Sequence, residues 1–77
     1  MVRNANLPSP AAPAKHAIAE RVRSRRLELG LSQFAVAARS GLSLPTISLI
    51  ERGGIITPAT AAKIGPVLGI DAAELLS

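Results

Sequence analysis

The chain has 77 residues, a net charge of +4 and no cysteine. This length allows one small domain, and the lack of cysteine excludes disulfides and thiolate zinc sites. Because His16 is the single histidine, one chain cannot build a multi-histidine metal site. We therefore expect neither a metal nor a cofactor.

The positive charge is concentrated in the first two thirds of the chain. Residues 1–53 contain eight Lys/Arg and three Glu, a net +5, whereas residues 54–77 contain one Lys, one Asp and one Glu, a net −1. This asymmetry suits a polyanionic partner, although a solubilising surface explains the charge equally well. No apolar run approaches the roughly 18 residues of a membrane span, and the N-terminus lacks a secretory apolar segment. We expect a cytoplasmic protein.

The first 14 residues have the composition of a flexible arm. Pro8, Pro10 and Pro13 lie among Ala, Asn and Ser, a mixture that does not hold a helix and has little to bury. The folded domain should then span residues 15–77. Arg3 would be able to reach a minor groove, but a tail without a function explains this composition more simply.

A first helix is predicted over residues 15–29. Its apolar stripe consists of Ile18, Val22 and Leu29. Gly30 ends this helix, and Leu31 should enter the core. Arg26 lies at the edge of the stripe, where a charged side chain needs a partner.

Two short helices joined by a tight turn are predicted next, over residues 32–40 and 44–52. Ser32 is a suitable N-cap for the first, and Gly41 ends it because glycine accepts a left-handed conformation. Ser43 caps the second, with Pro45 in its first turn, where a missing N–H costs least. Ile47 and Ile50 form its inward face, and Gly53 stops it.

The loop after this pair, residues 54–57, carries no charge and contains Ile55 and Ile56. These side chains either form an exposed apolar patch, which usually marks a partner, or fold back onto the core. Helix 4 is predicted over Pro58–Leu68, with a kink or break near residues 63–65 because Pro66 removes one backbone hydrogen bond.

A final short helix, Ala72–Leu76, follows an Asp71 cap. The fold class is therefore all-α, a compact domain of five helices. Two features of this arrangement are typical of a helix-turn-helix, namely the short second and third helices and the glycine in the turn between them.

The residues of this unit resemble those of lambdoid phage repressors and Cro proteins, and of the wider family of bacterial and phage transcriptional regulators built on them. The resemblance rests on Ala37, Gly41, Leu42 and Ile47, and on the segment Thr-Ile-Ser-Leu-Ile-Glu-Arg-Gly at residues 46–53. It runs without a gap from Glu20 to the C-terminus. It implies a repressor-like DNA-binding domain.

The resemblance also implies roles for individual residues. In similar repressors the position of Arg26 pairs with the acid near the end of the third helix, here Glu51, and we predict a partly buried structural ion pair. A glutamine at the position of Gln33 lies against a DNA phosphate in these proteins. Phe34 stands where the family usually has a polar residue, and it is either exposed or packed against helix 1 or a partner.

The third helix is the expected recognition helix, and it departs most from the family. Leu44, Pro45 and Leu49 face outward where polar residues usually read base edges, so they offer only contacts to thymine methyl groups. The remaining predicted DNA contacts are polar or charged: Ser43, Thr46, Ser48 and, for a phosphate, Arg52. The uncharged loop replaces one that is basic in close relatives.

The C-terminal region supplies the dimer contact in similar repressors. The candidate interface residues are Ile55, Ile56, Leu75 and Leu76.

We expect a sequence-specific regulator, a repressor acting as a homodimer on double-stranded DNA. The alternative is a helix-turn-helix fold that binds mainly protein, as an antitoxin-type module does, through the apolar face of helix 3. No paired carboxylates or phosphate-binding glycine loop indicate an enzyme.

Overall fold

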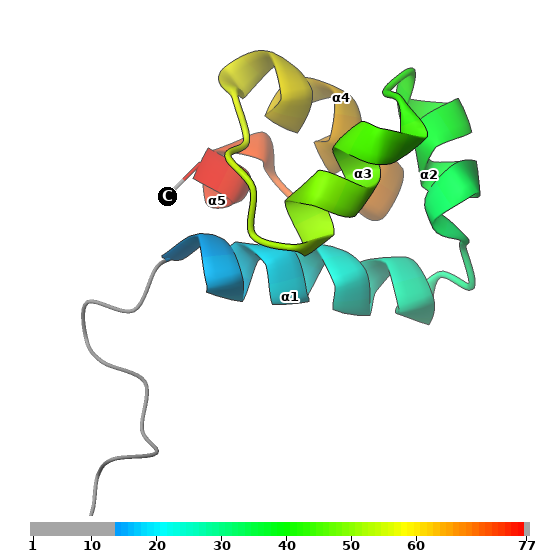
Figure 1. Cartoon of the computed structure of the whole chain (residues 1–77), viewed down its shortest axis with the longest axis horizontal. Helices are drawn as coiled ribbons and strands as arrows, with labels where there is room; N and C mark the ends of the chain where they lie inside the picture. The colour runs from blue at the N-terminus through cyan, green and yellow to red at the C-terminus, as the bar shows by residue number, and fades with distance from the viewer. Residues whose placement is uncertain (1–13, 77) are drawn as a thin grey trace, which may run out of the picture.

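The computed structural model describes residues 14–76, and the side chains of residues 17–76. This part of the chain forms five α-helices, which are α1 (Ala14–Glu28), α2 (Gln33–Ser40), α3 (Leu44–Glu51), α4 (Pro58–Leu68) and α5 (Ala72–Leu76). The all-α prediction is confirmed. Figure 1 shows α1 along one side of the domain, with the other four helices packed above it. The predicted arm and Arg3 lie outside the described residues, except that Ala14 begins α1.

The core is aliphatic, and every helix contributes to it. The largest fully buried side chains are Val22, Val36, Ile47, Ile50, Ile64, Leu68 and Leu75. Burying one such side chain stabilises the fold by about 1.5–3 kcal/mol. The two inward residues predicted for α3 are among them, so the inward face of the third helix is confirmed.

The end of α1 differs from the prediction. Val22 is buried and Ile18 packs against the core, but Leu29 is exposed, so its place in the apolar stripe was wrong. The helix ends at Glu28, and the chain turns at Gly30, whose φ is +70°. Leu31 then packs against the core as predicted.

Helix α4 runs from Pro58 to Leu68 without a break, so the predicted break near residues 63–65 is wrong, whereas the alternative of a kink stays a prediction. Pro66 cannot donate a hydrogen bond to the carbonyl of Ala62. Both residues are exposed, and water can reach that carbonyl. Gly65, by contrast, is buried, and a Cβ there would lie 2.6 Å from the carbonyl oxygen of Ile70. The glycine therefore allows the chain leading into α5 to approach α4 closely.

The short helix α5 packs one leucine inward and leaves one outward. Asp71 caps it, because Asp71 Oδ1 accepts a hydrogen bond of 3.1 Å from the Ala73 N–H. Leu75 is 1% exposed and belongs to the core, which corrects the expectation that its side chain is available for a dimer contact. Leu76 is exposed. No helix in the described range is long and apolar enough to cross a membrane.

Candidate nucleic-acid interface

Helices α2 and α3 form the predicted helix-turn-helix, and short-range hydrogen bonds fix its turn (Figure 1). Ser32 Oγ caps α2 by accepting from the Ala35 N–H at 2.9 Å. Gly41 ends α2 with a φ of +77°, and its N–H donates to the Ala37 carbonyl at 3.0 Å. Ser43 Oγ caps α3 by accepting from the Thr46 N–H at 3.2 Å. The caps and the glycine therefore have the roles predicted from the sequence.

A nearly buried ion pair holds α3 against α1. Arg26 Nε donates to Glu51 Oε2 at 2.6 Å, and Arg26 Nη2 donates to Glu51 Oε1 at 3.0 Å. The side chains are only 11% and 5% exposed. A third bond, from Arg26 Nη1 to the Leu31 carbonyl at 2.9 Å, ties the same guanidinium to the turn before α2. The predicted Arg26–Glu51 pair is confirmed, and its bidentate geometry fixes the angle between the two helices.

The pair favours the charged form of Arg26. The hydrogen bond to Glu51, together with the charge of its carboxylate, raises the pKa of the Arg26 guanidinium, while burial opposes this in part. A group whose pKa is raised on folding stabilises the fold fully at pH values below its unfolded pKa. The contribution of the Arg26 proton is therefore complete at neutral pH, and it is lost only as the pH rises through the folded pKa.

Gln33, the first residue of α2, extends this network. Its side-chain Nε2 donates to Glu51 Oε1 at 3.2 Å, and the residue is half-buried. Gln33 was predicted to lie against a DNA phosphate, and this remains a prediction. Its present partner shows that the same side chain also joins α2 to the ion pair between α1 and α3.

The outward face of α3 carries the predicted DNA-contacting residues. Leu44, Pro45 and Leu49 are exposed, and Ser48 is half-buried between them. Residues at i, i+1, i+4 and i+5 lie on one face of a helix. The structure therefore brings these four residues together, opposite the buried Ile47 and Ile50. No acidic residue occurs in the first turn of α3.

The polar groups at the two ends of α3 have different environments. At the start, the hydroxyl groups of Ser43 and Thr46 are hydrogen-bonded to each other at 2.8 Å. At the end, Arg52 forms the C-cap through its backbone N–H, and its side chain is exposed. No described residue holds that guanidinium in a hydrogen bond or ion pair. Arg52 is thus available to an anion. The hydroxyl groups of Ser43 and Thr46 already take part in hydrogen bonds within the N-cap.

The loop between α3 and α4 leaves one of its two isoleucines exposed. Ile56 packs against the core, whereas Ile55 is 77% exposed. The two alternatives for this loop were exposure and packing onto the core. The first applies to Ile55 and the second to Ile56. Phe34 on α2 is 70% exposed, as the first of its two alternatives expected. Ile55 and Leu76 remain candidates for contact with a second copy of the chain.

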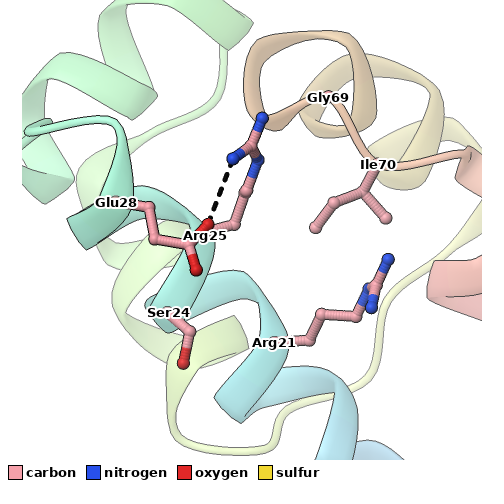
Figure 2. A pocket seen from close by; sticks show the side chains of 6 residues that line it. All are labelled: Arg21, Ser24, Arg25, Glu28, Gly69 and Ile70. Atoms are coloured by element: carbon pink, nitrogen blue, oxygen red, sulfur yellow. Dashed lines mark hydrogen bonds and ion pairs between the residues drawn. The ribbon is translucent and has the colours of Figure 1, made fainter.

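A hollow of about 260 Å³ lies between α1 and the linker from α4 to α5 (Figure 2), and its charged groups are already paired. Arg25 Nε donates to the Leu68 carbonyl at 2.8 Å, and Arg25 Nη1 lies 3.1 Å from Glu28 Oε1. Arg21 pairs with Glu74 at 2.6 Å. Arg25 caps the C-terminal end of α4, a structural role that the sequence did not reveal.

Among residues 17–76, no three His, Cys, Asp or Glu side chains lie together as metal ligands would.

Comparisons with known proteins place this geometry in a family. The profile of the family HTH_3, described as helix-turn-helix, matches residues 22–75. The restriction-modification controller protein C.AhdI from Aeromonas hydrophila is 30% identical, with a TM-score of 0.73 over 82% of this chain and 97% of its own. A hypothetical transcription factor from Neisseria, NHTF, is 28% identical, with a TM-score of 0.75 over 99% of this chain and 87% of its own. Curated protein sequences gave no match.

Proposed function

The chain belongs to the Cro/C1-type helix-turn-helix family of DNA-binding regulators, and we propose that it binds a specific duplex sequence as a homodimer and represses transcription there. Two copies of α3 would enter successive major grooves of a near-palindromic site, with half-sites about 34 Å apart. The regulator would act by binding, without catalysis, and in the cytoplasm with the DNA.

The observation that carries this proposal is the way α3 is mounted. Its inner face is buried through Ile47 and Ile50, and the Arg26–Glu51 pair locks it to α1. Its outer face is left open to a ligand. A rigid mounting is what a reading element requires, because base contacts depend on sub-ångström placement of a few side chains.

Two further facts support a regulator that binds DNA. Two of the solved relatives are a restriction-modification controller protein and a hypothetical transcription factor. The charge is also favourable, because residues 14–53 contain seven Lys/Arg against three Glu. One of these acids, Glu51, is buried in its ion pair. A homodimer is supported by the exposed apolar residues Ile55 and Leu76, which lie outside α3.

The test begins with selection of bound duplexes from a random pool, followed by fluorescence anisotropy on the enriched sequence and on a scrambled version of it. The proposal expects an affinity ratio of at least about 10³ between them, and two chains per duplex by sedimentation. Inserting five base pairs at the centre of the site should abolish tight binding, because the half-sites then face opposite sides of the helix. Failure to enrich any sequence would refute the proposal.

A second candidate function is protein binding, as in an antitoxin-type module. The observation in its favour is the exposed apolar surface, in which Phe34 and Ile55 are the most exposed large apolar side chains among the described residues. Mass photometry of the chain recovered from its host would detect a stable hetero-complex. A complex that is disrupted by Leu49→Asp, together with no binding to any duplex, would favour this function over the first.

A further inference from the structure

The outward face of α3, which would meet the DNA bases, is mainly apolar. Leu44 and Leu49 are 43% and 50% exposed, and Pro45 lies exposed between them on the same face. None of these three side chains has a hydrogen-bond donor or acceptor. Most base recognition in the major groove uses such groups. The exposed area that this helix offers to a groove is therefore mainly apolar.

The polar side chains of α3 do little to compensate. Ser43 and Thr46 share a hydrogen bond at 2.8 Å, which engages one of their two hydroxyl protons. Ser43 Oγ additionally accepts from the Thr46 N–H. Ser48 is half-buried. The hydroxyl groups of Ser43 and Thr46 are thus already engaged in the N-cap of α3. Most of the contact that α3 can make with base edges is therefore apolar.

Leu49 is also held in place before any ligand arrives. The Gly54 N–H donates to the Leu49 carbonyl at 2.9 Å. A Cβ on Gly54 would lie 2.6 Å from Leu49 Cγ, so the backbone at Gly54 lies directly against the leucine side chain. The loop therefore restricts one side of Leu49, and the residue remains 50% exposed to solvent. A prearranged apolar side chain loses little conformational entropy on binding.

We propose, on the basis of the proposed function, that α3 recognises the C5 methyl groups of pyrimidines in the major groove, with Leu44, Pro45 and Leu49 forming the contact surface. The C5 methyl is the apolar group that a base pair presents at that edge. Thymine carries it always, and cytosine carries it when methylated. No exposed carboxylate of α3 would repel the DNA phosphates, because its one acid, Glu51, is buried and paired with Arg26.

The experiment uses the full chain and the duplex selected from the random pool. Each thymine of a half-site is replaced in turn by uracil, which removes the methyl and leaves the hydrogen-bonding groups unchanged. Loss of one buried methyl should weaken binding about fourfold. At the sensitive positions, cytosine and 5-methylcytosine opposite guanine are then compared. If 5-methylcytosine binds about fourfold more tightly than cytosine, α3 recognises the methyl group on either base. If the two bind equally, α3 recognises the methyl group of thymine alone.

Variants assign the effect to α3. Leu49→Ala and Leu44→Ala should each bind thymine and uracil duplexes with nearly equal affinity at the affected position. Leu27→Ala removes a similarly exposed leucine from α1 and should keep the fourfold difference. Circular dichroism checks that each variant is folded. We expect all three to fold, because the three leucines are substantially exposed.

The outcomes separate this inference from the function on which it rests. If the selected duplex binds tightly but no uracil substitution changes the affinity by more than about 1.5-fold, the inference is overturned and the DNA-binding function stands. The inference is equally overturned if the Leu49→Ala and Leu44→Ala variants keep the full uracil effect. If no duplex binds at all, the proposed function fails, and the apolar face of α3 belongs to another partner.

Discussion

Replacing Glu51 by alanine should remove a large share of the stability of this domain. The change would leave the Arg26 guanidinium, whose side chain is 11% exposed, with only the Leu31 carbonyl as a partner. Gln33 would lose its acceptor as well. Removing one member of a buried pair costs about 3–5 kcal/mol. A domain of this size has a total unfolding free energy of about 4–12 kcal/mol, so much of the stability depends on this one carboxylate.

The assay is urea unfolding followed by circular dichroism, because the chain has no Trp or Tyr to report by fluorescence. We expect the unfolding free energy of Glu51→Ala to fall by about 3–5 kcal/mol and the Tm to fall by at least about 12 °C. Glu74→Ala is the matched control. The Glu74 side chain is 51% exposed in its pair with Arg21, and its removal should cost less than about 1 kcal/mol.

The comparison of the two variants decides whether the reasoning holds. If Glu51→Ala loses less than about 1 kcal/mol, similar to Glu74→Ala, the Arg26–Glu51 pair is no stronger than an exposed one and does not lock α3 to α1.

Four more outcomes follow from the structure. Gly65→Ala should lower the unfolding free energy by about 1–3 kcal/mol, measured by urea unfolding, because the new Cβ would meet the Ile70 carbonyl oxygen at 2.6 Å. Ser43→Ala should cost about 1 kcal/mol in the same assay, through loss of the α3 N-cap. Arg52→Ala should leave stability unchanged but reduce the slope of log affinity against log salt by about 2 for a dimer. Finally, the stability difference between wild type and Glu51→Ala should not fall between about pH 7 and pH 9, since the pKa of Arg26 is raised on folding.

Local features of the sequence predicted most of the fold. The caps Ser32 and Ser43 and the terminating Gly41 act within a few residues of themselves, so their effects can be read from short segments. The inward residues of α3 followed from helical spacing in the same way. The Arg26–Glu51 pair spans 25 positions, and it was predicted only because the sequence resembles a family in which these positions meet.

Features that depend on distant packing were missed. Arg25 caps α4 through Leu68, 43 residues away, and nothing near Arg25 in the sequence indicates that contact. Leu75 and Leu76 are adjacent leucines in a five-residue helix, too short for its periodicity to show which one turns inward. Pro66 was expected to interrupt α4, but the carbonyl it leaves without a donor lies on the exposed side of the helix.

The sequence predicted where the candidate site lies, but only in part which of its side chains are exposed and free to bind. The helix-turn-helix pattern located α3. Which residues of the following loop are exposed beside it could be learned only from the structure. Spacing could not separate Ile55 from Ile56, because a loop has no fixed periodicity. The structure places Ile56 against the core and leaves Ile55 in solvent. The engaged hydroxyls of Ser43 and Thr46 likewise appear only once the N-cap geometry is known.

Binding to mixed-sequence duplex DNA, measured by fluorescence anisotropy across salt concentrations, tests the central claim most directly. If α3 enters the major groove with Arg52 of each protomer on a phosphate, log affinity should fall with log salt with a slope of about −2 or steeper. A flat response, or no binding at low salt, would contradict the claim that this helix-turn-helix binds DNA.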